Sequence, residues 1–183
     1  MVVTEWQSSG NGFTPNVFAG SVAAGWSLVG TGDFTGNGMA DLVWQNGNTF
    51  TVWDSTGSGF TPNSFVGLVA PGWTLAGVGD FTGNGRDDLL WFNGGTGLFT
   101  IWDSNGNGFT PNSFVGSVAP GWTLAGTGDY NDDGRNDLLW RNTSTGTFTE
   151  WQSTGNGFIP NVVVNTTVPT DWTLQSSPTH LHV

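Results

Sequence analysis

Three loops with the same spacing of oxygen-bearing side chains are the part of the sequence best suited to chemistry. They begin at Asp33, Asp80 and Asp129 and are each nine residues long. Oxygen-bearing side chains occupy loop positions one, three, five and nine, and glycine occupies position six. Calcium takes six to eight oxygen ligands in a flexible shell, whereas magnesium demands a stricter octahedron. Because alternate positions of a tight loop can turn their oxygens toward one point, the spacing predicts a calcium site in each loop.

The predicted ligands are the side-chain oxygens at those four positions and the backbone carbonyl at position seven, whose side chain is then free to vary. In chain order they are Asp33, Thr35, Asn37, Met39 and Asp41, then Asp80, Thr82, Asn84, Arg86 and Asp88, then Asp129, Asn131, Asp133, Arg135 and Asp137. The third loop has three carboxylates among these ligands and the other two loops have two each, so we expect the third to bind calcium most tightly. The alternative is an Asx-rich turn held by its own hydrogen bonds without a metal.

The loops belong to a repeat that runs through the chain. One tryptophan series is Trp6, Trp53, Trp102 and Trp151, with spacings of 47, 49 and 49 residues. Two further series, beginning at Trp26 and Trp44, account for the remaining tryptophans. A residue that recurs in every unit does what every unit needs, so we expect the tryptophans to form the core between units. Sugar-stacking platforms at the unit junctions are the alternative role.

Each repeat predicts four short strands. In the unit from Trp73, apolar runs over 73–79, 89–92, 98–102 and 109–115 are separated by Gly- and Asn-rich turns, and the loop 80–88 joins the first two. Proline recurs in the fourth run, at Pro62, Pro111 and Pro160, which suits an edge strand because proline cannot donate to a ladder. Four strands per unit of this length predict an all-β fold, a β-propeller of four-stranded blades.

The chain supplies about four blades. We expect a single propeller domain over 1–183, with three complete blades at about 26–70, 73–119 and 122–168 and a composite blade formed by 2–24 with 171–183. A four-bladed monomer, a homodimer with eight blades and a fragment of a longer array all remain open; the dimer is favoured because an open arc leaves aromatic faces exposed.

Composition narrows the range of partners. The net charge is −11, with three Arg and no Lys, so nucleic acid is excluded as an expected partner and membrane insertion is not expected either. The absence of cysteine rules out disulfides and thiolate chemistry. The histidines, His180 and His182, lie in the last four residues, and the recurring acids are accounted for by the loops. We therefore expect no enzymatic activity.

The segment Asp-Phe-x-Gly-Asn-Gly-x-x-Asp-Leu, followed by a tryptophan-containing strand, resembles the FG-GAP/VCBS repeat. That family forms the propellers of integrin α-subunits, of certain fungal lectins and of extracellular repeat domains of bacterial proteins. The loops match the family's calcium ligands at each position, with Thr35 and Thr82 as departures from the usual Asp or Asn. The resemblance implies a calcium-binding, extracellular module for carbohydrate or protein ligands, with any export signal outside this chain. A structural, self-assembling repeat without a dedicated ligand is the alternative.

Overall fold

Residues 2–172 are described by the computed structural model, and within this part the chain forms fourteen β-strands and no helix. The described residues therefore include no helix of the length and apolarity needed to cross a bilayer. The all-β class predicted from the repeat is confirmed.

The strands form one two-stranded and three four-stranded antiparallel sheets. The first sheet contains β1 (Val2–Ser8) and β2 (Phe13–Ser21). The second contains β3 (Ser27–Gly32), β4 (Asp41–Asn46), β5 (Thr49–Ser55) and β6 (Phe60–Leu68). The third contains β7 (Thr74–Gly79), β8 (Asp88–Asn93), β9 (Leu98–Ser104) and β10 (Phe109–Ser117). The fourth contains β11 (Trp122–Gly128), β12 (Asp137–Asn142), β13 (Thr147–Ser153) and β14 (Phe158–Thr167).

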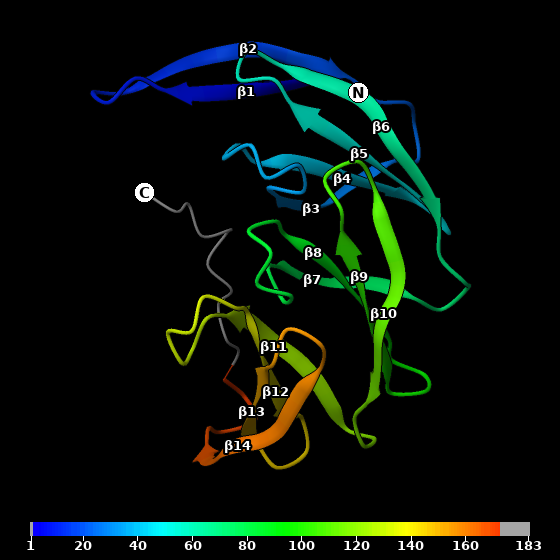
Figure 1. Ribbon diagram of the computed structural model, residues 1–183, viewed down its shortest axis with the longest axis vertical. Coiled ribbons are helices and arrows are strands. Elements are labelled where there is room, and N and C mark those ends of the chain that lie inside the picture. The colour runs from blue at the N-terminus through cyan, green and yellow to red at the C-terminus, as the bar shows by residue number, and fades with distance from the viewer. Residues whose placement is uncertain (1, 173–183) are drawn as a thin grey trace.

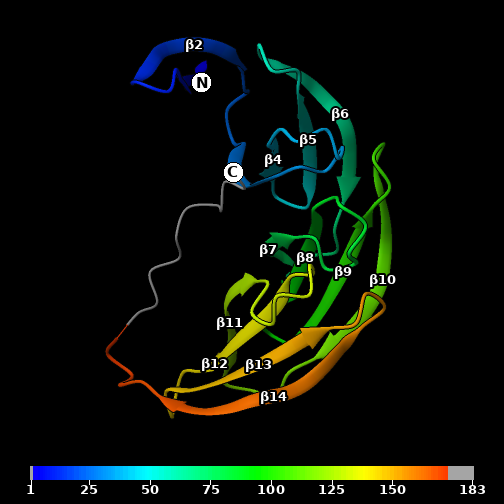
Figure 2. The ribbon, with the colours of Figure 1, turned by 60° about the vertical axis from the view of Figure 1, so that its left-hand side comes forward.

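Each four-stranded sheet is a propeller blade whose strands follow one another in sequence order. Figure 1 shows the blades stacked one after another along the chain, and Figure 2 shows that they follow a crescent, with β6, β10 and β14 along its convex side. The two ends of this crescent, the β1–β2 hairpin and the β11–β14 blade, lie apart. The first strand of the predicted composite blade falls mainly in 173–183, outside the described residues.

The innermost strands of neighbouring blades approach closely because they carry glycine. A Cβ added to Gly30 of β3 would lie 2.9 Å from a methyl of Leu75, and one added to Gly77 of β7 would lie 2.8 Å from a methyl of Thr127. The hydroxyl of Thr127 donates a hydrogen bond to the Val78 carbonyl at 3.2 Å, which links β11 to β7. The first strand of each complete blade therefore lines the crowded centre of the fold.

The prolines lie in the fourth strands, which are edge strands of their sheets, as predicted. The asparagine after each proline, at Asn63, Asn112 and Asn161, adopts a positive φ of 55 to 59°. This left-handed conformation, which Asn tolerates better than most residues, coincides with an irregularity in the pairing of the third and fourth strands. In the first of these blades the buried Thr51 hydroxyl donates to Asn63 Oδ1 at 3.1 Å, so the irregular position is tied to the sheet.

The core lies between blades and is largely aromatic. Trp91 and Trp140 are fully buried, and Trp44 is 2% exposed. Phe50 of one blade contacts Trp91 of the next at a ring-centroid distance of 5.0 Å, and Phe99 contacts Trp140 in the same way at 5.3 Å. This packing places Trp44, Trp91 and Trp140 in the core expected for the tryptophans. The expectation fails for Trp6 and Trp172, which are 63% and 64% exposed because no described blade lies against them.

Candidate functional site

The nine-residue loops connect the first and second strands of each complete blade and curl around their first carboxylate. In the first loop, Asp33 accepts backbone N–H groups from Gly36 at 2.8 Å, Asn37 at 3.0 Å and Gly38 at 2.7 Å. Both glycines have positive φ, 76° and 82°, which lets the chain turn sharply enough for these donors to converge. The Asn37 side-chain oxygen in turn accepts the N–H of Met39 at 2.8 Å. The second loop repeats this pattern around Asp80.

The aspartates at position nine are buried and face away from the loop's outer turn. Asp88 is fully buried, and its Oδ2 accepts the N–H groups of Phe81 at 3.1 Å and Thr82 at 3.2 Å. Its Oδ1 accepts the N–H of Ser104, at the end of β9, at 2.8 Å. Asp41 and Asp137 are buried in the same position and accept equivalent bonds.

Burial shifts the ionisation of these three carboxyl groups. Desolvation raises the pKa of Asp41 to about 6 and that of Asp88 to about 7 from an ordinary value of 3.8, with a further upward contribution from neighbouring carboxylates. The pKa of Asp137 is also raised, again mainly by desolvation. Backbone donors oppose the shift in all three without cancelling it. The position-nine aspartates are therefore buried hydrogen-bond acceptors that connect the loop to the end of the third strand.

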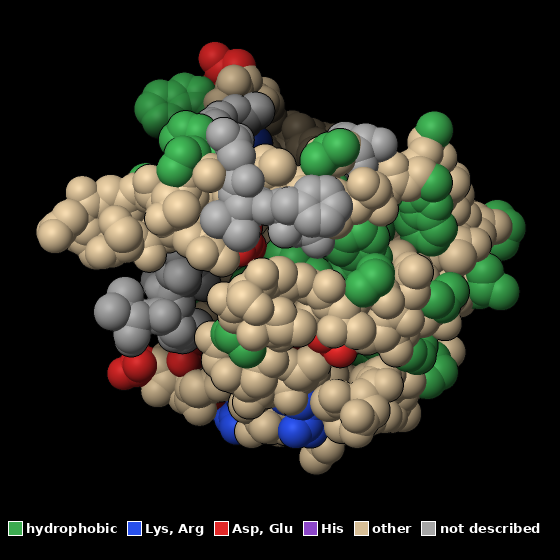
Figure 3. All heavy atoms as spheres, turned by 90° about the horizontal axis from the view of Figure 1, so that it is seen from above, with side chains coloured by type: hydrophobic (Ala, Val, Ile, Leu, Met, Phe, Trp, Pro, Cys, Tyr) green, Lys and Arg blue, Asp and Glu red, His purple; other side chains and the backbone are tan. Residues whose placement is uncertain are grey.

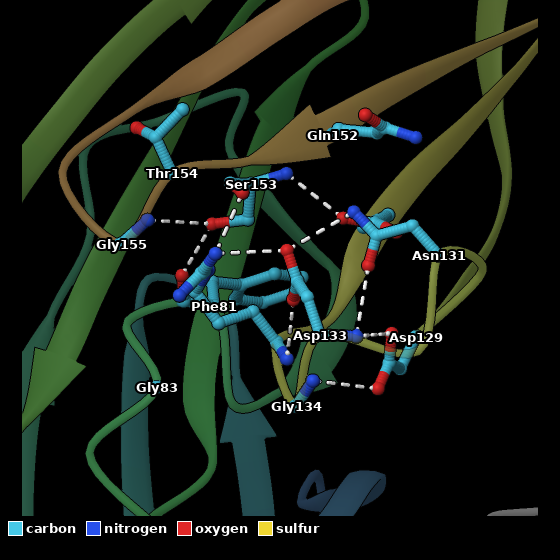
Figure 4. A network of polar contacts seen from close by, with 12 residues as sticks. Phe81, Gly83, Asp129, Asn131, Asp133, Gly134, Gln152, Ser153, Thr154 and Gly155 are labelled. Atoms are coloured by element: carbon cyan, nitrogen blue, oxygen red, sulfur yellow. Dashed lines mark hydrogen bonds and ion pairs between the residues drawn. The ribbon is translucent and has the colours of Figure 1, made fainter.

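The third loop differs from the other two in its charged contacts. Figure 4 shows Asp129, Asn131 and Asp133 of this loop beside Ser153 of β13 and Phe81 of the preceding blade. The Asp133 carboxylate forms an ion pair with Arg135 at 2.8 Å and accepts a bond from the Asn131 amide at 3.0 Å. Position four is Asp132 instead of glycine, and it adopts a positive φ of 61°. The extra carboxylate expected to strengthen calcium binding is thus already paired with a cation.

These contacts define what the loops offer a metal ion. Among residues 2–172, no three His, Cys, Asp or Glu side chains are grouped so that they could hold a metal. A calcium ion would bind at the outer arm of a loop, which comprises positions one to seven. There the side chains of positions one, three and five and the carbonyl of position seven supply oxygens. The oxygens of positions one and five already accept backbone N–H groups. A carboxylate oxygen has more than one lone pair and can share them. Calcium binding therefore stays a prediction.

The loops also connect neighbouring blades through position eight, for which the sequence carries no local signal. The Asp33 N–H donates to the Asp87 carboxylate at 2.8 Å, and the Asp87 N–H donates back to the Asp33 carbonyl at 2.9 Å. Asn136 pairs with Asp80 in the same reciprocal way, at 3.1 Å and 2.7 Å. The reciprocity of Asp33 with Asp87 and of Asp80 with Asn136 is visible only once the blades are stacked.

Two equivalent small cavities open at the junctions between complete blades. The first encloses about 90 Å³ between β3–β6 and β7–β10. Phe34, Phe65 and Phe109 form its apolar walls, and Asp54 and Asn107 are among its polar groups. The second, of about 80 Å³, lies one blade further on and is lined by the residues at the corresponding repeat positions, including Phe81, Phe114, Phe158, Asp103 and Asn156.

The polar wall of the first cavity is held in place by the blade that supplies it. The Ser64 hydroxyl donates to the Asp54 carboxylate at 2.6 Å. In the second cavity, Asp103 accepts a bond from the Asn84 amide of its own blade's loop at 2.9 Å. Each cavity is thus a recess with a hydrogen-bonded carboxylate, a side-chain amide on the neighbouring turn and aromatic surface.

The first hairpin and the last blade carry a different polar pair at the same repeat positions. Glu150 and Gln152 stand where the middle blades have an apolar residue and Asp, and the Gln152 amide donates to Glu150 at 2.9 Å. Gln7 donates to Glu5 in the first hairpin in the same way. The blades therefore fall into two chemical classes, Asp-bearing in the middle and Glu/Gln-bearing at the ends of the chain.

Comparison with known proteins identifies part of the repeat. The family model described as the FG-GAP-like repeat matches residues 33–91, which run from the first loop through the second strand of the following blade. This match confirms the resemblance noted from the loop sequence. No curated protein matches the sequence.

Two solved structures are similar in part. One is the Photorhabdus luminescens Tc holotoxin pore carrying a mutation in TccC3, with 20% identity and a TM-score of 0.47 over 79% of this chain. The other is the crystal structure of TcdB2-TccC3-Cdc42, with 18% identity and a TM-score of 0.46 over 82% of this chain. The chain spans only 8% and 9% of the lengths of those two chains.

Proposed function

Starting from a β-propeller-type chain that carries FG-GAP-like repeat sequence, we propose that it is a non-enzymatic binding module whose junction cavities take carbohydrate. The observation that supports this proposal is the recurrence of one recess at two successive junctions, with the same lining types at the same repeat positions. Equivalent sites at fixed spacing suit a ligand that is itself repetitive, because weak sites then act together.

The lining chemistry favours sugar over an apolar ligand. Carboxylate and amide groups such as Asp54 and Asn107 can accept and donate bonds to hydroxyls, while Phe65 and Phe109 offer apolar surface for the C–H face of a ring. The volume of about 90 Å³ is small beside the 300–1,000 Å³ of typical small-molecule pockets. Each recess therefore suits one sugar unit entering by its edge, and a single recess binds weakly.

We place this role outside the cell as part of the same proposal. The first two loops have only two carboxylates each among their predicted ligands, and calcium sites of low charge belong to the weak, 10⁻⁴–10⁻³ M class of extracellular modules. Loops of this kind would be occupied at extracellular calcium concentrations. A protein ligand at the same recesses, or a purely structural role, would show no response to sugars.

The test is a glycan array followed by calorimetric titration with the sugar that binds. Asp54→Ala and Asp103→Ala each remove one recess carboxylate, so each single variant should lower the stoichiometry by one site per chain, and the double variant by two. Thr110→Ala, on exposed β10 and outside both recesses, should leave the stoichiometry unchanged. Absence of any glycan signal from folded protein at millimolar calcium would sink the carbohydrate assignment.

A further inference from the structure

Both junctions between complete blades are built from the same two aromatic faces. We define the socket face of a blade as the aromatic residue at loop position two together with the apolar residues of the third and fourth strands. We define the plug face as the tryptophans of the second and third strands together with the phenylalanine that begins the fourth strand. At the first junction, Phe50 contacts Trp102 at a centroid distance of 5.6 Å and Phe65 contacts Phe109 at 5.3 Å. At the second, the corresponding distances are 5.8 Å and 5.4 Å.

The last blade presents a socket face that no described blade covers. On this face the Arg141 guanidinium lies 5.6 Å from the centroid of the Phe148 ring. Tyr130 stands at loop position two and is 46% exposed, whereas Phe81 at the same position is 2% exposed. Phe148 of β13 is half-buried, although its equivalents Phe50 and Phe99 are fully buried. This blade is the end of the crescent formed by β11–β14 in Figure 2.

The first hairpin presents the third- and fourth-strand part of the plug face, without the second-strand tryptophan, and no described blade covers it. Trp6 of β1 is 63% exposed and Phe13 of β2 is 65% exposed. Their equivalents in the following blades are covered, since Trp53 is 6% exposed and Phe109 is 9% exposed. The other side of the hairpin is occupied, because Val3 packs with the cluster that contains Trp53. The side that would meet a preceding blade has no described residue packed on it.

A recurring polar bond marks the same gap. The buried Ser104 hydroxyl donates to the Phe34 carbonyl of the preceding blade at 2.6 Å, and Ser153 donates to the Phe81 carbonyl at 2.6 Å. The next acceptor in this series is the Tyr130 carbonyl, and the equivalent donor is Ser8, which is exposed at the end of β1. Among residues 2–172, the Tyr130 carbonyl has no serine donor and the Ser8 hydroxyl has no carbonyl acceptor from another blade, and these two groups lie at opposite ends of the described chain.

We infer that a second copy of this chain covers these faces, with the plug face of one β1–β2 hairpin (Trp6, Phe13, Ser8) seated in the socket face of the other copy's last blade (Tyr130, Phe148). The faces of one chain do not meet in the described structure, where the hairpin and the last blade lie at separate ends of the crescent (Figure 2). The partner is a second copy because the open faces repeat, apart from the second-strand tryptophan, the two faces that already fit each other twice within the chain. Two such head-to-tail seams close a ring of two copies.

Each seam would also complete a junction recess of the Glu/Gln class. Glu150 and Gln152 line the socket side of the last blade at the positions where Ile101 and Asp103 line the second cavity. The turn before Phe13 would supply the opposite wall, as the turn before Phe158 does inside the chain. This recess is incomplete in one copy. The inference about the seam is independent of the carbohydrate proposal, because it rests on the aromatic faces and the serine bond.

Charge sets the conditions of the test. Each copy carries a formal net charge of −11, so two copies repel each other at low ionic strength. Figure 3 shows acidic side chains scattered over one face of the molecule and hydrophobic side chains gathered on the side where β6 and β10 lie in Figure 1. That outer-strand surface includes Leu68, which is 70% exposed and outside both faces of the seam, and it provides the control.

The first experiment is light scattering of the full chain at about 0.15 M salt, where the Debye length is about 8 Å. The expected mass is twice the 19.3 kDa of one chain. Trp6→Ser and Phe148→Ser should each weaken association about 30-fold or more, as loss of an aromatic interface anchor does. Ser8→Ala should weaken it about 3- to 10-fold, and Leu68→Ser should leave it unchanged. A wild type that stays monomeric, or a dimer indifferent to both aromatic substitutions, overturns the inference.

Mixing separates a seam from a folding defect. The Trp6→Ser variant keeps an intact socket and the Phe148→Ser variant keeps an intact plug, so an equimolar mixture regains one native seam and should recover part of the dimer. Far-UV circular dichroism of each variant alone confirms that it is folded. Folded variants whose mixture forms no dimer count against a head-to-tail contact.

Cross-linking distinguishes two copies from one closed chain. The protein has no cysteine, so a Phe13→Cys, Tyr130→Cys double variant carries only the two introduced thiols. A short bis-maleimide should join them between chains and give a covalent dimer, because the equivalent pair Phe109 and Phe34 has a ring-centroid distance of 5.5 Å. Cross-linking within a single chain, covalent chains that grow beyond two copies, or no cross-link at all would each overturn the two-copy assembly.

Discussion

The Asp88 carboxylate accepts the Ser104 backbone N–H at 2.8 Å. Because it also accepts two N–H groups of its own loop, it connects the loop between β7 and β8 to the end of β9. Removing the carboxylate leaves three donors without this acceptor, two of them buried with it. We expect Asp88→Ala to lower the free energy of unfolding by about 3 kcal/mol, which for a chain of this size is a fall in Tm of roughly 6–12 °C. Asp171→Ala, at an exposed position, should change Tm by about 1 °C or less. Equal Tm values for the two variants would mean that the loop does not depend on this carboxylate.

Stability should fall as the pH rises from about 4 to about 8. The carboxyl groups of Asp41 and Asp88 have pKa values of about 6 and about 7 in the folded protein against an ordinary 3.8, so the folded state holds these protons more tightly. Their contribution is complete below the unfolded pKa and is lost as the pH rises through the folded one. Tm measured in chelator across this range should decline, and Asp88→Asn, which cannot titrate, should flatten the decline. A Tm that increases with pH over this interval contradicts the assignment.

Calcium should raise Tm if the outer arms of the loops bind it. An ion at about 100 times its dissociation constant adds about 2.7 kcal/mol per site, so melting with calcium and with chelator should differ clearly. Asp133→Ala should reduce this difference more than Asn84→Ala, because it removes a charge as well as an oxygen. The comparison uses the calcium-minus-chelator shift for each variant, since Asp133→Ala also removes the ion pair with Arg135. Superimposable melting curves of the wild type in the two buffers exclude a calcium role.

The serine bond between blades should have a measurable effect on stability. Ser104→Ala removes the buried hydroxyl that donates to the Phe34 carbonyl, and we expect a loss of about 1–2 kcal/mol. Ser55 occupies the same position in β5 and has no described hydrogen bond from its hydroxyl to another blade, so Ser55→Ala is the matched control and should cost less. Urea unfolding of the two variants gives the comparison. A cost for Ser55→Ala as large as that for Ser104→Ala would show that the inter-blade bond adds nothing.

The sequence is sufficient to predict the four-stranded blade and the position of its strands, because both depend on local, repeated patterns. Proline in the fourth strand and small residues in the first have direct steric consequences, and Pro62 and Gly77 lie where those consequences require. The buried tryptophans follow from the same reasoning, because a side chain present in every unit is available at every junction.

The orientation of the loop aspartates could not be predicted in the same way. An Asp at position nine reads equally well as a metal ligand and as an acceptor for backbone donors, and only the positions of the Phe81, Thr82 and Ser104 N–H groups show what Asp88 contacts. The reciprocal bonding of Asp33 with Asp87 depends on residues 54 positions apart and carries no local signal. The ion pair of Asp133 with Arg135 is likewise not predictable from the spacing, because the spacing predicts only a backbone carbonyl ligand at position seven.

Because every junction uses one plug and one socket, the repeat unit can be taken to begin at any of its residues. A duplication or deletion of 47 to 49 residues beginning at any point of the unit would add or remove one blade and leave every junction inside the chain with one plug and one socket. The length of such an array is therefore free to drift in whole units through unequal recombination, while a change of a few residues would break a strand. Variation in blade number should be far easier to acquire than variation in blade size.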